Sequence, residues 1–284
     1  MIVVANNNGQ TCNRLVLFAR TLATALQTHQ SLVFLFGMDV RQTLDISCGR
    51  VAGIRVRCFR WSGRSTMRAI LLVLHWVGIH PFCPERRRAF SKRLPALLGK
   101  MAGRPNRFHP VFMWDFRNDD ALFRFQSILV SKFPFRPEHL QRPGRFCELL
   151  RRSFSCLVGV HIRRGDYRTF HNGKYYYDDD TYARFMLSFS KSFERPVAFC
   201  VCSNEPIRSE AFGELIRNNV FVMDNNSMYE DLALLSLCDY VMGPPSTFSW
   251  CAAYWGQKPY LPIYAQQEDC NRSRFELHAS VPMP

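Results

Sequence analysis

Residues 156–167 read CLVGVHIRRGDY. The first five are apolar and form a run short enough for a strand that is buried on both faces, as in a parallel sheet. One imidazole, two guanidinium groups and one carboxylate follow at His161, Arg163, Arg164 and Asp166. In open α/β sheets, ligands bind just beyond the carboxyl ends of the strands. This stretch therefore predicts an α/β fold with a site for an anion at the end of its central strand.

An ordinary surface ion pair between Asp166 and one of the two arginines is the alternative interpretation, and such pairs contribute little free energy. We favour a ligand site because charged side chains seldom crowd the end of a buried strand without a function. Neighbouring side chains on an extended backbone point in different directions. One guanidinium can therefore grip phosphate oxygens as a two-pronged fork while the other packs or forms an ion pair.

The rest of the chain alternates between predicted strands and helices. Strands are predicted at 1–5, 31–36, 112–115, 196–202, 220–223 and 240–242. Helices are predicted at 15–26, 68–79, 87–99, 137–153, 182–192, 207–218, 229–237 and 246–255, and residues 121–133 fit either type. Such alternation is typical of doubly wound parallel sheets. We place a domain boundary near residue 150, which gives domains at 1–150 and 151–284.

The composition indicates a globular chain with an anionic partner. Hydrophobic residues make up 47% of the 284 residues, and the net charge is +14. A basic chain of this kind suits nucleic acid, an anionic membrane surface or a phosphorylated substrate. Because the arginines are scattered rather than gathered in a tail, charge alone does not choose among them. A basic module that binds nucleic acid or anionic polysaccharide therefore stays open as an alternative of another class.

The cysteines and the N-terminus favour a cytoplasmic protein. The chain has 11 cysteines, none of them in a C-x-x-C pair, and it begins without a signal-peptide pattern. We therefore expect reduced thiols. The apolar segment 69–79 is too short to span a bilayer. A buried helix is the preferred interpretation of this segment, and a peripheral membrane contact through it and residues 86–88 is the alternative.

A second candidate site lies at residues 243–249, which read GPPSTFS. The glycine and the two prolines end a strand, and Ser246, Thr247 and Phe248 open the next helix. Hydroxyl groups and backbone N–H groups at a helix N-terminus bind phosphate well, because the donors lack helical partners and the helix dipole favours an anion. Helix capping by Ser246 would be the preferred interpretation of these residues alone. Together with the arginine cluster, they favour a phosphate site.

The N-terminus has a similar layout of strand, polar loop and helix. The loop contains Gly9, and Asn13 follows at the start of the helix. Such a layout directs backbone N–H groups at an anion or a sugar. The loop lacks the glycine-lysine pattern of a Walker loop and the G-x-G-x-x-G pattern of dinucleotide-binding folds. On its own it would be interpreted as a plain turn.

Taken together, the three segments resemble the α-1,2-fucosyltransferase family. HIRRGDY at 161–167 is similar to its His-x-Arg-Arg-x-Asp motif, residues 228–256 to its C-terminal motif, and residues 9–15 to its N-terminal loop. Related α-1,6- and protein O-fucosyltransferases share looser forms of all three. The chain departs from the pattern at Cys12, at Arg14 and at residues 243–245, so the acceptor and the linkage stay open.

The resemblance implies a GT-B-like architecture of two facing Rossmann-like domains. Residues 1–150 would form the acceptor side, and residues 151–284 would bind GDP-β-L-fucose. The implied reaction is inverting transfer of fucose to a galactoside hydroxyl of a glycan in α-1,2 linkage, without a metal or other cofactor and without a nucleic-acid partner. An α-1,6- or protein O-fucosyltransferase is the nearest alternative. Nothing in the sequence indicates an oligomeric state.

The resemblance also assigns roles to particular residues. Arg163 would clamp the pyrophosphate, whose charge grows as the glycosidic bond breaks, and Arg164 would support it or touch the sugar. Phosphate oxygens would be held by Ser246, Thr247 and Phe248, the guanosine by His161 and Asp231, and the cleft lined from the other domain by Gly9 and Asn13.

Two carboxylate assignments remain open in the sequence. Asp166 is the candidate general base, because it is the nearest carboxylate within the motif. An equally good interpretation is that Asp166 orients the arginines. The acidic run 178–180 could imitate a D-x-D metal motif. It follows no predicted strand, so no metal site is expected.

Overall fold

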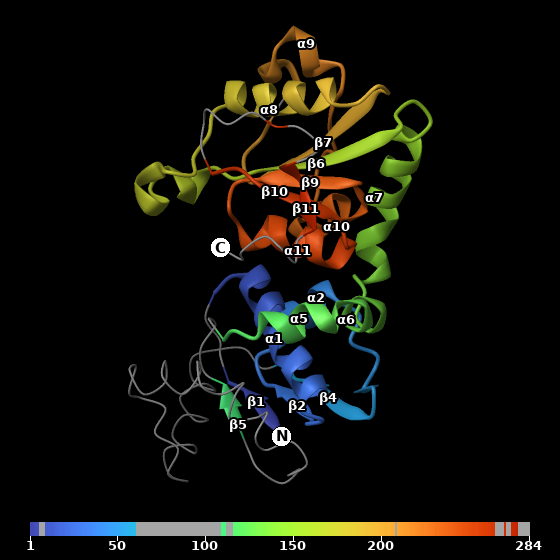
Figure 1. Cartoon of the computed structure of the whole chain (residues 1–284), viewed down its shortest axis with the longest axis vertical. Coiled ribbons are helices and arrows are strands. Elements are labelled where there is room, and N and C mark those ends of the chain that lie inside the picture. Colours follow the sequence, from blue (N-terminus) through green and yellow to red (C-terminus); the bar gives the residue numbers. More distant parts are fainter. Residues whose placement is uncertain are drawn as a thin grey trace. The chain divides into compact units, whose positions relative to one another are not determined.

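Figure 1 shows the computed structural model of the chain. The structure describes residues 1–5, 9–60, 109–111, 116–207, 209–264, 270 and 274–277. The helices predicted at 68–79 and 87–99, the strand predicted at 112–115 and the candidate membrane contact at 69–79 and 86–88 lie outside these residues. The chain divides into two compact units, Met1–Arg136 and Pro137–Pro284.

The first unit is built on a five-stranded sheet with the strand order β3-β4-β2-β1-β5. Its elements are β1 (Ile2–Val4), α1 (Thr11–Gln27), β2 (Leu32–Phe34), α2 (Met38–Thr43), β3 (Arg50–Val51), β4 (Ile54–Cys58), β5 (His109–Val111), α5 (Asp119–Arg124) and α6 (Gln126–Lys132). β1 pairs in parallel with β2 and β5, and β2 in parallel with β4. Only β3 runs antiparallel to its neighbour β4. The sequence did not predict this hairpin, because alternating arginines mask its apolar positions.

Helix α1 is buried on nearly all sides. The predicted apolar face from Leu15 to Leu26 is covered, and so is Arg20, which forms an ion pair with Asp119 of α5. The hydroxyl groups of Thr21 and Thr24 donate hydrogen bonds to the backbone carbonyl oxygens four residues earlier in the helix. The helix can therefore be enclosed without leaving these polar side chains unpaired.

The second unit contains a six-stranded sheet with the strand order β11-β10-β9-β6-β7-β8. Its elements are α7 (Pro137–Leu150), β6 (Cys156–Ile162), α8 (Asp179–Lys191), β7 (Val197–Ser203), α9 (Glu214–Arg217), β8 (Val220–Val222), α10 (Met228–Leu237), β9 (Tyr240–Gly243), α11 (Thr247–Gly256), β10 (Pro259–Pro262) and β11 (Glu276–Leu277), with 3-10 turns η1 (Gly165–Arg168), η2 (Phe170–Gly173) and η3 (Ser209–Phe212). All strand pairs are parallel except β10 with β11.

Helices cover both faces of this sheet, as Figure 1 shows for α8 on one side and α10 and α11 on the other. Val158 and Val160 of β6 pack into a core with Phe185 and Phe189 of α8. On the opposite face a Cβ atom on Gly159 would lie only 2.8 Å from Cδ2 of Leu235, so α10 can approach β6 closely only because residue 159 is glycine. The predicted doubly wound parallel sheet is therefore confirmed, and β6 lies in its interior.

Helix α7 sits on a different side of the domain division from the one we predicted. It contacts α10, and Arg142 of α7 donates hydrogen bonds to the Asp224 carbonyl and the Glu230 carboxylate. The division by contacts consequently falls between Arg136 and Pro137 rather than near residue 150. Helix α7 begins at Pro137, and proline is common at the first position of a helix. The start of this helix, and not its end, therefore marks the division between the two units.

Two predicted helices differ from the observed ones. The helix predicted at 207–218 is broken into η3 and α9, because Gly213 between them adopts a positive φ of 75°. The helix predicted to open at Thr181 begins at Asp179, with Asp178 as its N-cap accepting a 2.9 Å hydrogen bond from the Thr181 N–H. The uncertain segment 121–133 forms α5 and α6 in succession.

Candidate functional site

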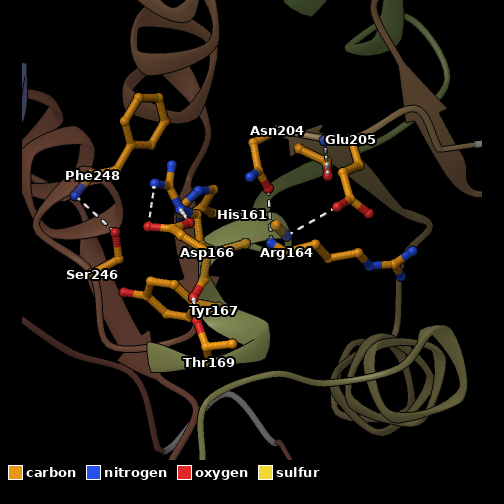
Figure 2. Close-up of polar contacts among 12 residues, drawn as sticks. His161, Arg164, Asp166, Tyr167, Thr169, Asn204, Glu205, Ser246 and Phe248 are labelled. Carbon is orange, nitrogen blue, oxygen red and sulfur yellow. Dashed lines mark hydrogen bonds and ion pairs between the residues drawn. The ribbon is translucent and has the colours of Figure 1, made fainter. Parts of the chain in front are cut away.

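The loop after β6 is fixed by the end of the neighbouring strand β7. The backbone N–H of Arg164 donates to Oδ1 of Asn204 at 2.8 Å, and that of Gly165 donates to Oε1 of Glu205 at 3.0 Å (Figure 2). Gly165 has a φ of +56°, a conformation that favours glycine. The path of the loop that carries both arginines is thus set by the two side chains that directly follow β7.

The two arginines point in different directions. Arg163 donates from Nε and Nη2 to the two oxygens of Asp166, at 2.9 and 3.0 Å. Arg164 forms an ion pair with Asp179 at the start of α8. In Figure 2 the labelled Arg164 side chain runs to the opposite side of the loop from Asp166. Only Arg163 therefore faces the second candidate site.

That second site is the tight connection between β9 and α11. Ser246 is the N-cap of α11, and its Oγ accepts a 3.1 Å hydrogen bond from the Phe248 N–H. A Cβ atom on Gly243 would lie 2.7 Å from the carbonyl oxygen of His161, so this position requires glycine for the close approach of β6 and β9. The helix N-terminus is consequently held against the end of β6.

Tyr167 and His161 tie the two sites together. The Tyr167 hydroxyl donates to the Pro245 carbonyl at 2.7 Å, and the Arg163 guanidinium lies 5.7 Å from the centre of the Tyr167 ring. Nδ1 of His161 is hydrogen-bonded to Oγ of Ser249 at 2.7 Å. The His161 ring also lies 4.8 Å from the Phe248 ring, centre to centre. The arginine loop and the start of α11 therefore form one structure.

Burial keeps His161 neutral. Its side chain is only 3% exposed, and burial together with the charge of Arg163 lowers its pKa to about 3. Burial likewise raises the pKa of Tyr167. Both groups thus stay uncharged at neutral pH, and the positive charge of this region comes from the guanidinium groups.

Asp231 lies in the first turn of α10. Its carboxylate accepts a 2.8 Å hydrogen bond from Nδ2 of Asn226. Cys202, the residue that pairs with His161 across β6 and β7, donates weakly to the Asp231 carbonyl at 3.8 Å. Burial raises the pKa of Asp231. The Asp231 residue is therefore linked to β7, the strand next to β6, which leads to the arginine loop.

The predicted site residues fall into three groups. Those gathered at the end of β6 and the start of α11 are His161, Arg163, Asp166, Ser246, Thr247 and Phe248. Arg164 lies in the same loop and Asp231 in the first turn of α10, and their side chains contact Asp179 and Asn226. Gly9 and Asn13 belong to the first unit, where Gly9 has a φ of +89° and a Cβ atom on it would lie 2.9 Å from that of Asn13.

Both alternative interpretations of the sequence describe contacts that exist. Arg163 is paired with Asp166, whose side chain is 52% exposed, and Ser246 caps α11. Neither contact excludes a ligand, because exposed ion pairs exchange readily and a serine hydroxyl that accepts one hydrogen bond still has its own hydrogen to donate.

The sequence assigned no individual role to four residues that shape the site, namely Tyr167, Asn204, Glu205 and Ser249. Asn204 and Glu205 could have been found from their place directly behind a predicted parallel strand, since the carboxyl ends of such strands meet at one edge. Nothing in the sequence signals that the Tyr167 hydroxyl reaches Pro245, which lies 78 residues later.

The acidic run 178–180 serves the fold locally. Asp178 caps α8, hydrogen bonds from Thr181 lower its pKa, and Asp179 pairs with Arg164. Within the described part of the chain, no three acidic, histidine or cysteine side chains are grouped as metal ligands. The cysteines described there are free thiols, and the described helices include none with the length and hydropathy to cross a membrane.

Solved structures with a similar fold are fucosyltransferases. NodZ from Bradyrhizobium matches with a TM-score of 0.59 and 16% identity over 92% of this chain and 94% of that one. FUT1 from Arabidopsis thaliana, in complex with GDP, gives 0.57 and 13% over 93% and 71%. POFUT1 in complex with GDP-fucose gives 0.52 and 12% over 93% and 97%. These similarities confirm the predicted α/β fold with parallel sheets.

Sequence similarity is confined to the part that carries the candidate site. No curated protein matches the chain. Residues 141–275, which include every predicted site residue except Gly9 and Asn13, match the family described as Glycosyl transferase family 11.

Proposed function

We propose that the chain is a fucosyltransferase that uses GDP-fucose as donor and a glycan hydroxyl as acceptor. The observation that carries this proposal is the joining of Arg163 to the N-terminus of α11 through Tyr167 and His161. A guanidinium and a helix N-terminus are two strong devices for binding phosphate oxygens. The match to Glycosyl transferase family 11 and the fold shared with NodZ, described as an alpha-1,6-fucosyltransferase soaked with GDP-fucose, support the choice of reaction.

Arg163 acts on the leaving group. When the bond between fucose and GDP breaks, its electron pair stays on the β-phosphate, so negative charge grows there. A guanidinium already positioned beside that phosphate stabilises the transition state more than the ground state. Ser246, Thr247 and Phe248 add hydroxyl and backbone donors, and no metal is required by this arrangement. His161 and Asp231 contribute to the guanosine side.

Asp166 is the proposed base for the acceptor. It would take the proton of the attacking hydroxyl, whose oxygen forms the new bond to the anomeric carbon from the face opposite GDP, with inversion. Arg164 has a supporting role, because its contacts fix the loop on which Arg163 stands.

The proposed linkage is α-1,2 to a galactoside, on the strength of the HIRRGDY motif at 161–167. An α-1,6 or protein O-linked product is the alternative, since NodZ and POFUT1 share the fold. Incubation with radiolabelled GDP-fucose and a panel of galactosides, chitin oligosaccharides and protein acceptors, followed by linkage mapping, separates these outcomes. Transfer to none of them would contradict the proposal.

A basic binding module is the function of another class that the charge of +14 allows. Such a module would lose affinity for a polyanion log-linearly with salt and would show no nucleotide preference. The proposed enzyme is instead stabilised against thermal unfolding by GDP, and much less by ADP or UDP. Melting curves with the three nucleotides at equal concentration distinguish the two.

A further inference from the structure

The ion pair between Arg163 and Asp166 has the geometry of a bound phosphate. Nε and Nη2 form one edge of the guanidinium, and each donates to a different carboxylate oxygen, at 2.9 and 3.0 Å. Carboxylate and phosphate present similarly spaced oxygens, and arginine grips both with this two-pronged fork. Asp166 therefore holds an edge of Arg163 that suits a phosphate.

Exposure shows which partner faces the solvent. The Arg163 side chain is 20% exposed, whereas that of Asp166 is 52% exposed. The Tyr167 ring lies along the guanidinium at 5.7 Å. In Figure 2 the Asp166 carboxylate points to the side on which Ser246 and Phe248 lie. An anion that approaches Arg163 toward the start of α11 consequently meets the carboxylate first.

We infer that Asp166 competes with the donor's diphosphate for Arg163, so that donor binding displaces the carboxylate and frees it. This inference rests on the proposed function and extends it to the order of events. Two anions on one guanidinium would repel each other at close range, and a diphosphate carries more charge than a carboxylate. An exposed ion pair costs little to break, so the exchange is easily reversed when GDP leaves.

The consequence for the reaction is that the base becomes stronger when the donor is present. While Asp166 is held by both oxygens, one lone pair of each points at Arg163, and the charge of the guanidinium makes the carboxylate a weaker proton acceptor. Once it is displaced, the same carboxylate is free to turn toward the acceptor hydroxyl on the face of the sugar opposite GDP. Asp166 would thus be a positioning residue before donor binding and the base afterwards.

The test is calorimetric titration with GDP and GMP of the wild-type protein and of Asp166→Asn, which keeps the shape but removes the charge. Competition predicts that Asp166→Asn binds GDP about two- to fivefold more tightly, as expected for loss of one exposed ion pair. GMP lacks the terminal phosphate, so its affinity should change by less than about twofold. Asp166→Ala should shift GDP affinity in the same direction, which guards against a folding defect in one variant.

Asp180→Asn is the matched control. Asp180 is another exposed carboxylate of the same unit, in the first turn of α8, and it has no part in the proposed donor site. Weaker GDP binding by Asp166→Asn would overturn the inference, because Asp166 would then orient Arg163 for the phosphate. An equal gain in Asp180→Asn would also overturn it, since general repulsion would suffice. Failure of the wild type to bind GDP would instead remove the proposed function itself.

Discussion

The two sides of the loop after β6 are neighbours in sequence but differ in how they are held. The Arg164 side consists of Arg164, Gly165, Asp179, Asn204 and Glu205, and there backbone N–H groups donate to the side chains of the two residues that follow β7. The Arg163 side consists of Arg163, Asp166, Tyr167, Ser246 and Phe248.

On the Arg163 side the guanidinium is paired with an exposed carboxylate and lies against a tyrosine ring. One side is fixed by the fold, while the other offers a contact that a ligand can replace. Binding sites need both properties, because a rigid support lowers the entropy lost when the ligand is ordered. The difference teaches that the first arginine of the motif acts on the ligand and the second on the loop.

The largest expected difference between the two sides is in the rate of fucose transfer. Arg163→Ala should lower kcat/KM for fucose transfer by at least about 100-fold, as for loss of a donor that stabilises transition-state charge. Arg164→Ala should lower it by less than about tenfold while reducing the midpoint of thermal unfolding, because Asp179 loses its partner. Equal losses of activity in the two variants, with unchanged thermal midpoints, would break the comparison.

A smaller effect concerns His161, which the Arg163 side keeps buried and neutral. Its pKa is about 3 in the folded protein and near 6.5 when unfolded. Between these values the unfolded chain binds the extra proton, so this stabilisation is complete above pH 6.5 and is lost progressively as pH falls toward 3. The loss amounts to about 1 kcal/mol by pH 5.5.

Replacement of His161 by glutamine should therefore flatten the dependence of the unfolding free energy on pH between 7.5 and 5.5. Denaturant unfolding at several pH values measures this, and His171→Gln, at an exposed ring, is the control. A His161→Gln variant with the slope of the wild type would show that the imidazole is not held neutral by burial.

The smallest expected effect is on the link between the two segments. Tyr167→Phe removes the hydrogen bond to the Pro245 carbonyl and leaves that oxygen unpaired in a buried position. We expect a loss of about 1 kcal/mol in the free energy of unfolding. GDP affinity should fall along with it, because the start of α11 would no longer be held to Arg163. A loss of stability without any change in GDP affinity would mean that Tyr167 serves the core alone.

Much of the fold could be predicted because the second unit follows simple periodicities. β6, β7, β8 and β9 are apolar runs that end in polar residues, and α10 begins with a capping box between Ser227 and Glu230. β10 and β11 were not recognised, because prolines frame the first and the second is only two residues long. The break at Gly213 depends on a single backbone angle.

The site was predictable to the level of segments but not of contacts. From the sequence, Arg163 follows one predicted strand and Ser246 closely follows another. The carboxyl ends of parallel strands meet at one edge of a sheet. The divergence of the two arginines followed from extended backbone geometry. That Arg164 pairs with Asp179 and Arg163 with Asp166 depends on three-dimensional packing around Tyr167, and the sequence carries no periodicity for it.

The most direct test of the account is a crystal structure of the protein with GDP. The account predicts that oxygens of the terminal phosphate lie within hydrogen-bonding distance both of the Arg163 guanidinium and of the donors at Ser246–Phe248. A diphosphate that contacts neither, or that binds at Arg164 while Arg163 keeps a purely structural role, would contradict it.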